Sequence, residues 1–205
     1  LALPPIIRGK SLHNWKNVTA ELLNNGWRRW EIANLGGEEF LLECGATRGQ
    51  LNLTADWPMY AGNTSAARQL LDMGYQRITL QPDDENENWL KMIENCGNFA
   101  DVIIYQDTPL AISAVCANAS LNGECVGREN CNFTKMKLTS KKGEELFAIN
   151  NHCQTVYINR EPLNHIGRKF ELTARGAKNL KLVFMYQDYS PVMVKRIFDS
   201  AKLPD

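Results

Sequence analysis

The sequence lacks both a long apolar run and a net charge. No stretch approaches the roughly 18 consecutive apolar residues of a membrane-spanning helix, and no signal-peptide pattern opens the chain. Lysine plus arginine and aspartate plus glutamate each number 23 among 205 residues. This balance excludes a global electrostatic attraction to nucleic acid or to an anionic membrane, although it leaves a local basic patch open. Because 44% of the residues are hydrophobic, we expect a folded core rather than disorder.

Several catalytic motifs are absent too. No G-x-G-x-x-G follows an expected strand, and no phosphate-binding G-x-x-x-x-G-K-[ST] occurs. The G-x-S-x-G nucleophile elbow and the zinc-binding H-E-x-x-H helix are also missing. His152 adjoins Cys153, but neighbouring strand residues point to opposite faces, so they make a poor nucleophile–base pair. These absences leave a dinucleotide fold and the familiar protease mechanisms without direct support.

The chain begins with Leu1 rather than with methionine. We therefore expect a processed or excised piece of a longer protein, from which residues of the same chain or of a partner subunit are missing. N-x-[ST] sequons occur at five positions, namely Asn17, Asn52, Asn63, Asn118 and Asn132. Asn17 falls in an expected helix and Asn52 at the start of an expected strand, so chance explains them better than glycosylation. The chain is large enough to fold without disulfide staples, and we expect a cytoplasmic protein.

The sequence does contain a regular alternation of strand and helix patterns. Strands are expected at Ile6-Ile7 and over residues 30–35, 51–57, 77–81, 102–105, 155–159 and 180–186. Helices are expected over residues 12–25, 64–73, 83–93, 163–176 and 191–198. A β-hairpin is expected from residues 135–138 and 145–149, around the Lys-Gly turn at Gly143.

Alternation of this kind, with short connections, predicts an α/β fold with a mainly parallel sheet and right-handed crossovers. The repeating units have about 20 to 25 residues, a length typical of a (β/α) barrel. An incomplete barrel that has lost its first units and an open sheet both fit this pattern. We expect a single domain over residues 1–205, with a cysteine loop and hairpin inserted at about residues 108–153.

Polar residues follow the expected strands, where parallel α/β folds carry their chemistry. The pocket candidates at these carboxyl ends are Asn34, Asp56, Gln81, Tyr105 and Arg160. Neighbouring acidic residues such as Asp83, Asp84 and Asp188 are better explained as helix caps or solvated turns. Asp56 and Gln81 are harder to explain in that way. No single residue is assigned a catalytic role from the sequence.

Four of the six cysteines follow the strand expected at residues 102–105, and they are Cys116, Cys125, Cys131 and Cys153. Their spacing lacks the C-x2–4-C knuckle that is usual in structural zinc sites. A [4Fe–4S] cluster needs four thiolates but no knuckle, and soft thiolate ligands suit either metal. Disulfides and free thiols remain alternatives. Cys44 and Cys96 lie apart from this loop, and Cys96 is expected to pack as a small hydrophobe.

Four segments together resemble peptidase family U32, the collagenase-like proteases. They are NLGGEEFL after a strand, LNLTADWPMYAGNTSAARQLLDMGYQRITLQPDDE, DTPLAISAVC with the cysteines that follow, and KKGEELFAINNHCQTVYINREPL. The resemblance covers nearly the whole chain, as the later part of the family's catalytic domain. The chain departs from the family before Cys116, where Ala111 to Val115 replace a Gly-rich segment with His-Gly or Tyr-Gly.

The resemblance implies a TIM-barrel-like domain in which Cys116, Cys125, Cys131 and Cys153 match the four ligands of a [4Fe–4S] cluster. Better-understood relatives hydroxylate tRNA or ribosomal RNA, or take part in oxygen-independent ubiquinone hydroxylation. We therefore expect iron–sulfur-dependent modification of RNA or of a quinone precursor. The alternatives are a true peptidase of unassigned catalytic type and a non-catalytic accessory module with a structural metal site.

Overall fold

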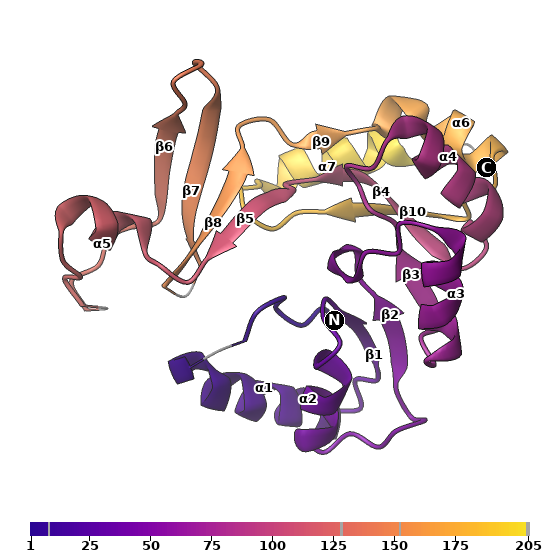
Figure 1. The fold of residues 1–205 in the computed structure, drawn as a ribbon, viewed down its shortest axis with the longest axis horizontal. Helices are drawn as coiled ribbons and strands as arrows, with labels where there is room; N and C mark the ends of the chain where they lie inside the picture. Colours follow the sequence, from indigo (N-terminus) through magenta and orange to yellow (C-terminus); the bar gives the residue numbers. More distant parts are fainter. Residues whose placement is uncertain (8, 128, 152, 204–205) are drawn as a thin grey trace. The chain divides into compact units, whose positions relative to one another are not determined.

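The computed structural model describes residues 1–7, 9–127, 129–151 and 153–203, and their contacts divide the chain into two compact units (Figure 1). Unit 1 comprises Leu1–Ile104 and Gly167–Lys181. Unit 2 comprises Tyr105–Ile166 and Leu182–Asp205. The chain passes from one unit to the other three times, within strands β4 and β10 and at the 3-10 turn Ile166–Arg168. Among the described residues, no helix has the length and apolar character needed to cross a membrane.

Unit 1 contains a parallel sheet. Its strands are β1 (Arg29–Ile32), β2 (Asn52–Ala55), β3 (Arg77–Thr79), β4 (Ala100–Gln106) and β10 (Asn179–Val183), in that order across the sheet. The pairs β1–β2, β2–β3 and β3–β4 are parallel. Ala2 adds an isolated parallel bridge beside Glu31 of β1. The sheet is curled, and the mixed α/β arrangement is compatible with an incomplete barrel-like fold.

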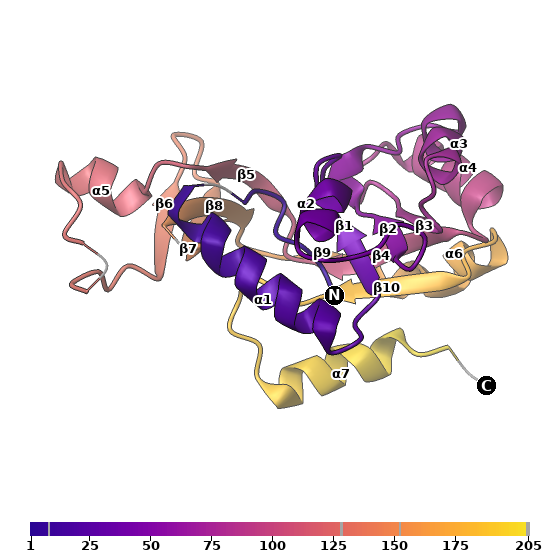
Figure 2. The same ribbon diagram turned by 90° about the horizontal axis from the view of Figure 1, so that it is seen from below.

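Helices precede or connect the parallel strands, and all but the second of them are predicted by the sequence pattern. They are α1 (Leu12–Asn24), α2 (Gly37–Glu43), α3 (Thr64–Asp72), α4 (Asn86–Cys96) and α6 (Lys169–Ala174). Single 3-10 turns lie at Gly9–Ser11, Trp57–Met59 and Ile166–Arg168. Helix α3 begins where the Asn63 side-chain oxygen accepts a hydrogen bond of 2.8 Å from the Ala66 amide, as an N-cap does. Helix α1 lies beside α2, and α3 lies beside α4 (Figure 1 and Figure 2).

The core of unit 1 lies on the helix-facing side of the sheet. Trp30 and Ile32 of β1 are 3% and 0% exposed, and Ile78 of β3 is 0% exposed. A Cβ atom on Gly37 would lie only 2.1 Å from the Cγ2 atom of Ile32, so α2 packs closely on β1. Because strand side chains alternate between faces, the residues between these apolar ones point to the opposite face of the sheet.

Unit 2 contains an antiparallel sheet with the strand order β5-β8-β7-β6. Its strands are β5 (Pro109–Ser113), β8 (Gln154–Asn159), β7 (Glu145–Asn151) and β6 (Lys135–Thr139). The short strand β9 (Leu163–Asn164) pairs antiparallel with Tyr105 and Gln106 of β4. Helices α5 (Ala117–Asn122) and α7 (Pro191–Ala201) complete the unit. The predicted hairpin is confirmed as β6 and β7, with Gly143 at a φ of 85° in its turn.

The structure corrects four expectations about the secondary structure. Residues 155–159 belong to the antiparallel sheet, because the tight turn after β7 can join only antiparallel neighbours. Ile6-Ile7 forms no strand. The helix expected over residues 163–176 begins only at Lys169, because Leu163–Asn164 pair with β4 and tertiary pairing overrides helical propensity. The segments at β5, α2 and α5 contain regular elements that the sequence did not indicate.

Candidate functional site

Polar side chains line one face of the parallel sheet in unit 1. They occupy alternate positions of five strands or the residue that follows a strand, and they are Glu31, Thr54, Asp56, Arg77, Thr79, Asp101 and Lys181. Parallel sheets are usually covered by helices on both faces and have apolar residues on both. A polar face is therefore a departure that calls for a role in binding or in chemistry.

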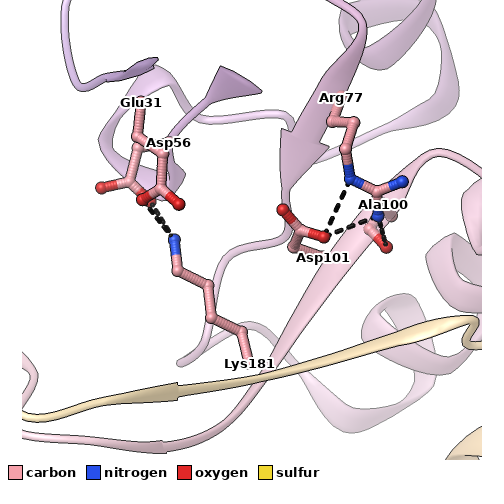
Figure 3. A network of polar contacts seen from close by, with 6 residues as sticks. All are labelled: Glu31, Asp56, Arg77, Ala100, Asp101 and Lys181. Atoms are coloured by element: carbon pink, nitrogen blue, oxygen red, sulfur yellow. Dashed lines mark hydrogen bonds and ion pairs between the residues drawn. The ribbon is translucent and has the colours of Figure 1, made fainter. Parts of the chain in front are cut away.

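Lys181 of β10 lies between two carboxylates on this face (Figure 3). Its Nζ atom is 2.6 Å from Oε2 of Glu31 in β1 and 3.3 Å from Oδ1 of Asp56, which follows β2. Burial of the ammonium acts to lower its pKa, but the negative charges and hydrogen bonds of Asp56 and Glu31 outweigh burial, so the pKa of Lys181 lies above its usual value. We call these three residues the Lys181 cluster.

A second ion pair joins the neighbouring strands β3 and β4. The Nε and Nη2 atoms of Arg77 donate to Oδ1 of Asp101 at 3.0 and 2.6 Å, and Nη2 also donates to the carbonyl oxygen of Ala100 at 3.0 Å (Figure 3). An open cavity of about 570 Å³ begins here, at the amino ends of the strands. Glu31, Thr54, Arg77 and Asp101 are among its lining residues.

Three of the five predicted pocket residues lie in unit 1. Asp56 belongs to the Lys181 cluster. Gln81 donates from Nε2 to Oδ1 of Asp83 at 2.5 Å, while its Oε1 atom is buried and has no hydrogen-bond partner among the described residues. Asn34 is exposed and donates to the carbonyl oxygen of Pro5 at 3.0 Å, so its visible contact is with the amino-terminal segment.

The other two predicted residues, Tyr105 and Arg160, lie in unit 2 and line one open cavity of about 520 Å³. Tyr105 is buried, and its ring centroid lies 5.6 Å from that of Phe184. Arg160 donates to Oε2 of Glu145 at 2.5 Å. Lys135, in the same cavity, places its Nζ atom 3.7 Å from the centroid of the Phe147 ring. Arg160 follows β8, so it stands at the end of an antiparallel strand rather than of a parallel one.

The sequence prediction missed Glu31 and Lys181, the two partners of Asp56. A signal for both exists, because each is a charged residue in the middle of an apolar strand segment, W-E-I in β1 and L-K-L in β10. Both lie in the middle of a strand rather than at its carboxyl end, where the fold pattern predicts the chemistry.

Three of the four loop cysteines lie on segments that adjoin one end of the antiparallel sheet in unit 2. Cys116 lies three residues after the end of β5, Cys131 lies four residues before the start of β6, and Cys153 lies between β7 and β8. Ser113 pairs with Thr155, Asn151 pairs with Gln154, and Lys135 pairs with Ile149, so these strand ends coincide. Cys125 lies on the connection from α5 to β6, and Figure 1 shows α5 to the side of the sheet that ends with β6.

Two buried or half-buried polar side chains hold the segments together. The Thr155 hydroxyl accepts a hydrogen bond from the Ala117 amide at 2.9 Å and donates to the Val115 carbonyl oxygen at 3.0 Å. It therefore fixes the backbone on both sides of Cys116. Asn150 donates from its side chain to the Phe133 carbonyl oxygen at 2.9 Å and accepts from the Cys153 amide at 3.0 Å. It thus links the segment after Cys131 to Cys153.

The six cysteine thiols are free. Within the described ranges, no three Cys, His, Asp or Glu side chains lie close enough to hold a metal ion. The four loop cysteines match a [4Fe–4S] cluster in number and in ligand type, but the described structure does not bring three of their sulfur atoms within reach of one metal ion. Burial raises the pKa values of Cys44 and Cys96, and Cys96 is a packed apolar residue as predicted. His152 lies outside the described residues.

A scan against models of protein families finds no match to this chain, and searches of curated proteins and of solved structures find none either.

Proposed function

We propose that this chain is part of an iron–sulfur-dependent enzyme of the U32 type that modifies RNA or a quinone precursor. The observation that supports the proposal best is that Cys116, Cys131 and Cys153 lie on segments that adjoin one end of the antiparallel sheet, with Cys125 on the connection between the first two. Disulfide staples would explain such clustering equally well by position, but all four thiols are free. The curled parallel sheet is also what an incomplete TIM-barrel-like domain would contain.

Cys116, Cys125, Cys131 and Cys153 would hold the cluster, which supplies one-electron redox chemistry when bound. Thr155 and Asn150 position two of the cysteine segments through their backbone hydrogen bonds. Asp56 and Gln81, near the carboxyl ends of β2 and β3, would contact a polar part of the substrate, since ligands of parallel α/β folds bind at those ends.

Metal analysis of anaerobically prepared protein tests this proposal. We expect about four iron and four sulfide ions per chain and the broad visible absorption of a [4Fe–4S] cluster. Serine substitution of any one of the four loop cysteines should lower the iron content, whereas Cys44→Ser, outside the loop, should leave it unchanged. Iron-free protein, or equal iron content in the Cys116→Ser and Cys44→Ser variants, would contradict the cluster.

The peptidase alternative is tested with the same variants. Casein or gelatin hydrolysis by iron-free protein, lost on Cys116→Ser, would assign the thiol a nucleophilic role instead. Metallated protein can then be assayed on undermodified RNA and on a quinone precursor. If cluster-loaded protein, supplied with its partner subunit, hydroxylates neither substrate, the result would favour a non-catalytic accessory module.

A further inference from the structure

The Lys181 cluster contains more hydrogen-bond acceptors than donors. Two carboxylates share one ammonium, so the cluster has a net negative charge. The contacts engage one oxygen of each carboxylate, Oε2 of Glu31 and Oδ1 of Asp56. An ionised carboxylate can accept several hydrogen bonds through both oxygens. The side chains of Glu31 and Asp56 remain 30% and 20% exposed, so a ligand can reach them from the polar face.

A buried hydroxyl on the same face adds an independent sign of a missing partner. Thr79 is 1% exposed, and its Oγ1 atom has no hydrogen-bond partner among the described residues. Thr79 shares a face with Arg77, two residues earlier on β3. Thr54 pairs with Arg77 and Ala55 with Ile78, so the continued register sets Asp56 beside Thr79. Buried polar groups are nearly always paired in native proteins, so this hydroxyl indicates that a polar ligand or water belongs here.

Gln81 lies two residues after Thr79 and continues the line of polar side chains along this part of the chain. Its Nε2 donates to Asp83, while its buried Oε1 has no partner among the residues that the structure describes. The acceptors that remain around Asp56 are therefore a carboxylate oxygen, a hydroxyl oxygen and an amide oxygen. An anionic ligand fits poorly, because the cations Lys181 and Arg77 are already paired with carboxylates.

We propose that this face of the sheet binds a small ligand, or part of a substrate, that presents a positively charged N–H donor group such as a guanidinium. The group would donate to the free Asp56 oxygen, to Thr79 and to Gln81, and it would offset the surplus negative charge of the Lys181 cluster. The site requires no iron–sulfur cluster, so this proposal and the proposed function can fail separately.

Titration with two cations of equal charge tests the proposal. Methylguanidinium offers N–H donors, whereas tetramethylammonium has the same charge and none. We expect methylguanidinium to bind at least about tenfold more tightly, the ratio that corresponds to roughly one charge-assisted hydrogen bond. Binding can be measured from amide chemical shifts of unit 1 residues at constant ionic strength. Acetate, titrated in the same way, should shift none of them.

Three variants locate the site. Asp56→Asn should weaken methylguanidinium binding about tenfold, and Thr79→Val should weaken it severalfold. The valine variant removes only an unpaired hydroxyl, so it keeps the test valid if the Asp56 variant folds poorly. Glu94→Gln, which neutralises an exposed carboxylate that pairs with Arg175, is the matched control and should bind as the wild type does. Equal affinity for both cations, unchanged affinity in Thr79→Val, or tighter binding of acetate would overturn the proposal.

Discussion

Lys181 and Glu31 form an ion pair of 2.6 Å although 150 residues separate them in the sequence. Their strands, β10 and β1, stand at opposite ends of the strand order β1-β2-β3-β4-β10. In a flat sheet these two strands would lie about 19 Å apart, at roughly 4.8 Å for each step between neighbouring strands. One lysine and one glutamate side chain cannot bridge that gap, so the sheet must curl and bring its first and last strands closer together. The pair is therefore evidence that the sheet of unit 1 is curved, and its two charged groups form part of the polar face.

Removal of the Lys181 ammonium should destabilise unit 1. In Lys181→Met, Glu31 and Asp56 keep their charges without a cation between them. Breaking a fully buried pair costs roughly 3–5 kcal/mol. The side chains here are 19–30% exposed, so we expect about 1–3 kcal/mol, measured by urea unfolding.

Lys91→Met is the control, because Lys91 pairs with Glu87 one turn away on the surface of α4 and exposed pairs contribute little. The triple variant Lys181→Met, Glu31→Gln, Asp56→Asn should recover part of the loss, because it leaves no unpaired charge. A triple variant less stable than Lys181→Met would contradict this account.

The Thr155 hydroxyl should matter for both stability and metal content. Thr155→Val leaves the Ala117 amide and the Val115 carbonyl oxygen without their shared partner, and we expect a loss of about 1–3 kcal/mol. Since these groups flank Cys116, the variant should also retain less iron after anaerobic preparation. Thr155→Ser keeps the hydroxyl and should resemble the wild type in iron content. Equal iron in the valine and serine variants would show that Thr155 does not position Cys116.

Gly97, at the end of α4, is held in close contact with the turn that follows α6, and no side chain fits there. A Cβ atom would lie 2.2 Å from the carbonyl oxygen of Gly176 and 2.6 Å from that of Ile93. Gly97→Ala should therefore lower the free energy of unfolding by about 1–3 kcal/mol, as overpacking does. Gly167→Ala is the matched control, because nothing lies within 4 Å of its Cβ position. Similar melting temperatures for the two variants would disprove the tight contact.

Glu145 should make the stability of the antiparallel sheet in unit 2 depend on pH in the acidic range. Hydrogen bonds from Lys137 and Arg160 hold the pKa of Glu145 below its usual value. Its contribution is therefore complete above the unfolded pKa of about 4.3 and is lost as the pH falls through the lower folded value. Wild type should exceed Glu145→Gln in melting temperature at pH 7, and this difference should vanish on acidification. Glu161→Gln, which removes a carboxylate 3.5 Å from Arg160, should give a smaller difference at neutral pH.

Much of the fold was predictable where patterns are local. The helices α1, α3 and α7 were predicted because each combines an apolar period with clear end signals, such as Asn63 before α3 and Pro191 at the start of α7. The hairpin β6–β7 was predicted from its turn. Strand β8 was misassigned to the parallel sheet, because strand patterns do not say which partner a strand chooses. Helix α2 was missed because seven residues between glycines show little periodicity.

The site was less predictable, because its central contact is not local. Asp56 stood out as a polar residue after a strand, but its link to Lys181 crosses 125 residues. The sequence predicts that Tyr105 and Arg160 line the same pocket as Asp56, because all three are expected at the carboxyl ends of parallel strands. The structure places Tyr105 and Arg160 in unit 2 instead. The convergence of the cysteine segments depends on strand register, which residue spacing does not reveal.

The long separation between Glu31 and Lys181 has a consequence for synthesis of the protein. The ribosome adds about 5–20 residues per second, so Lys181 emerges on the order of ten seconds after Glu31 and Asp56. During that interval the nascent chain has both carboxylates but not their cation. Any structure that β1 and β2 form before β10 is made therefore carries Glu31 and Asp56 without their ammonium, and water must solvate these charges until Lys181 arrives.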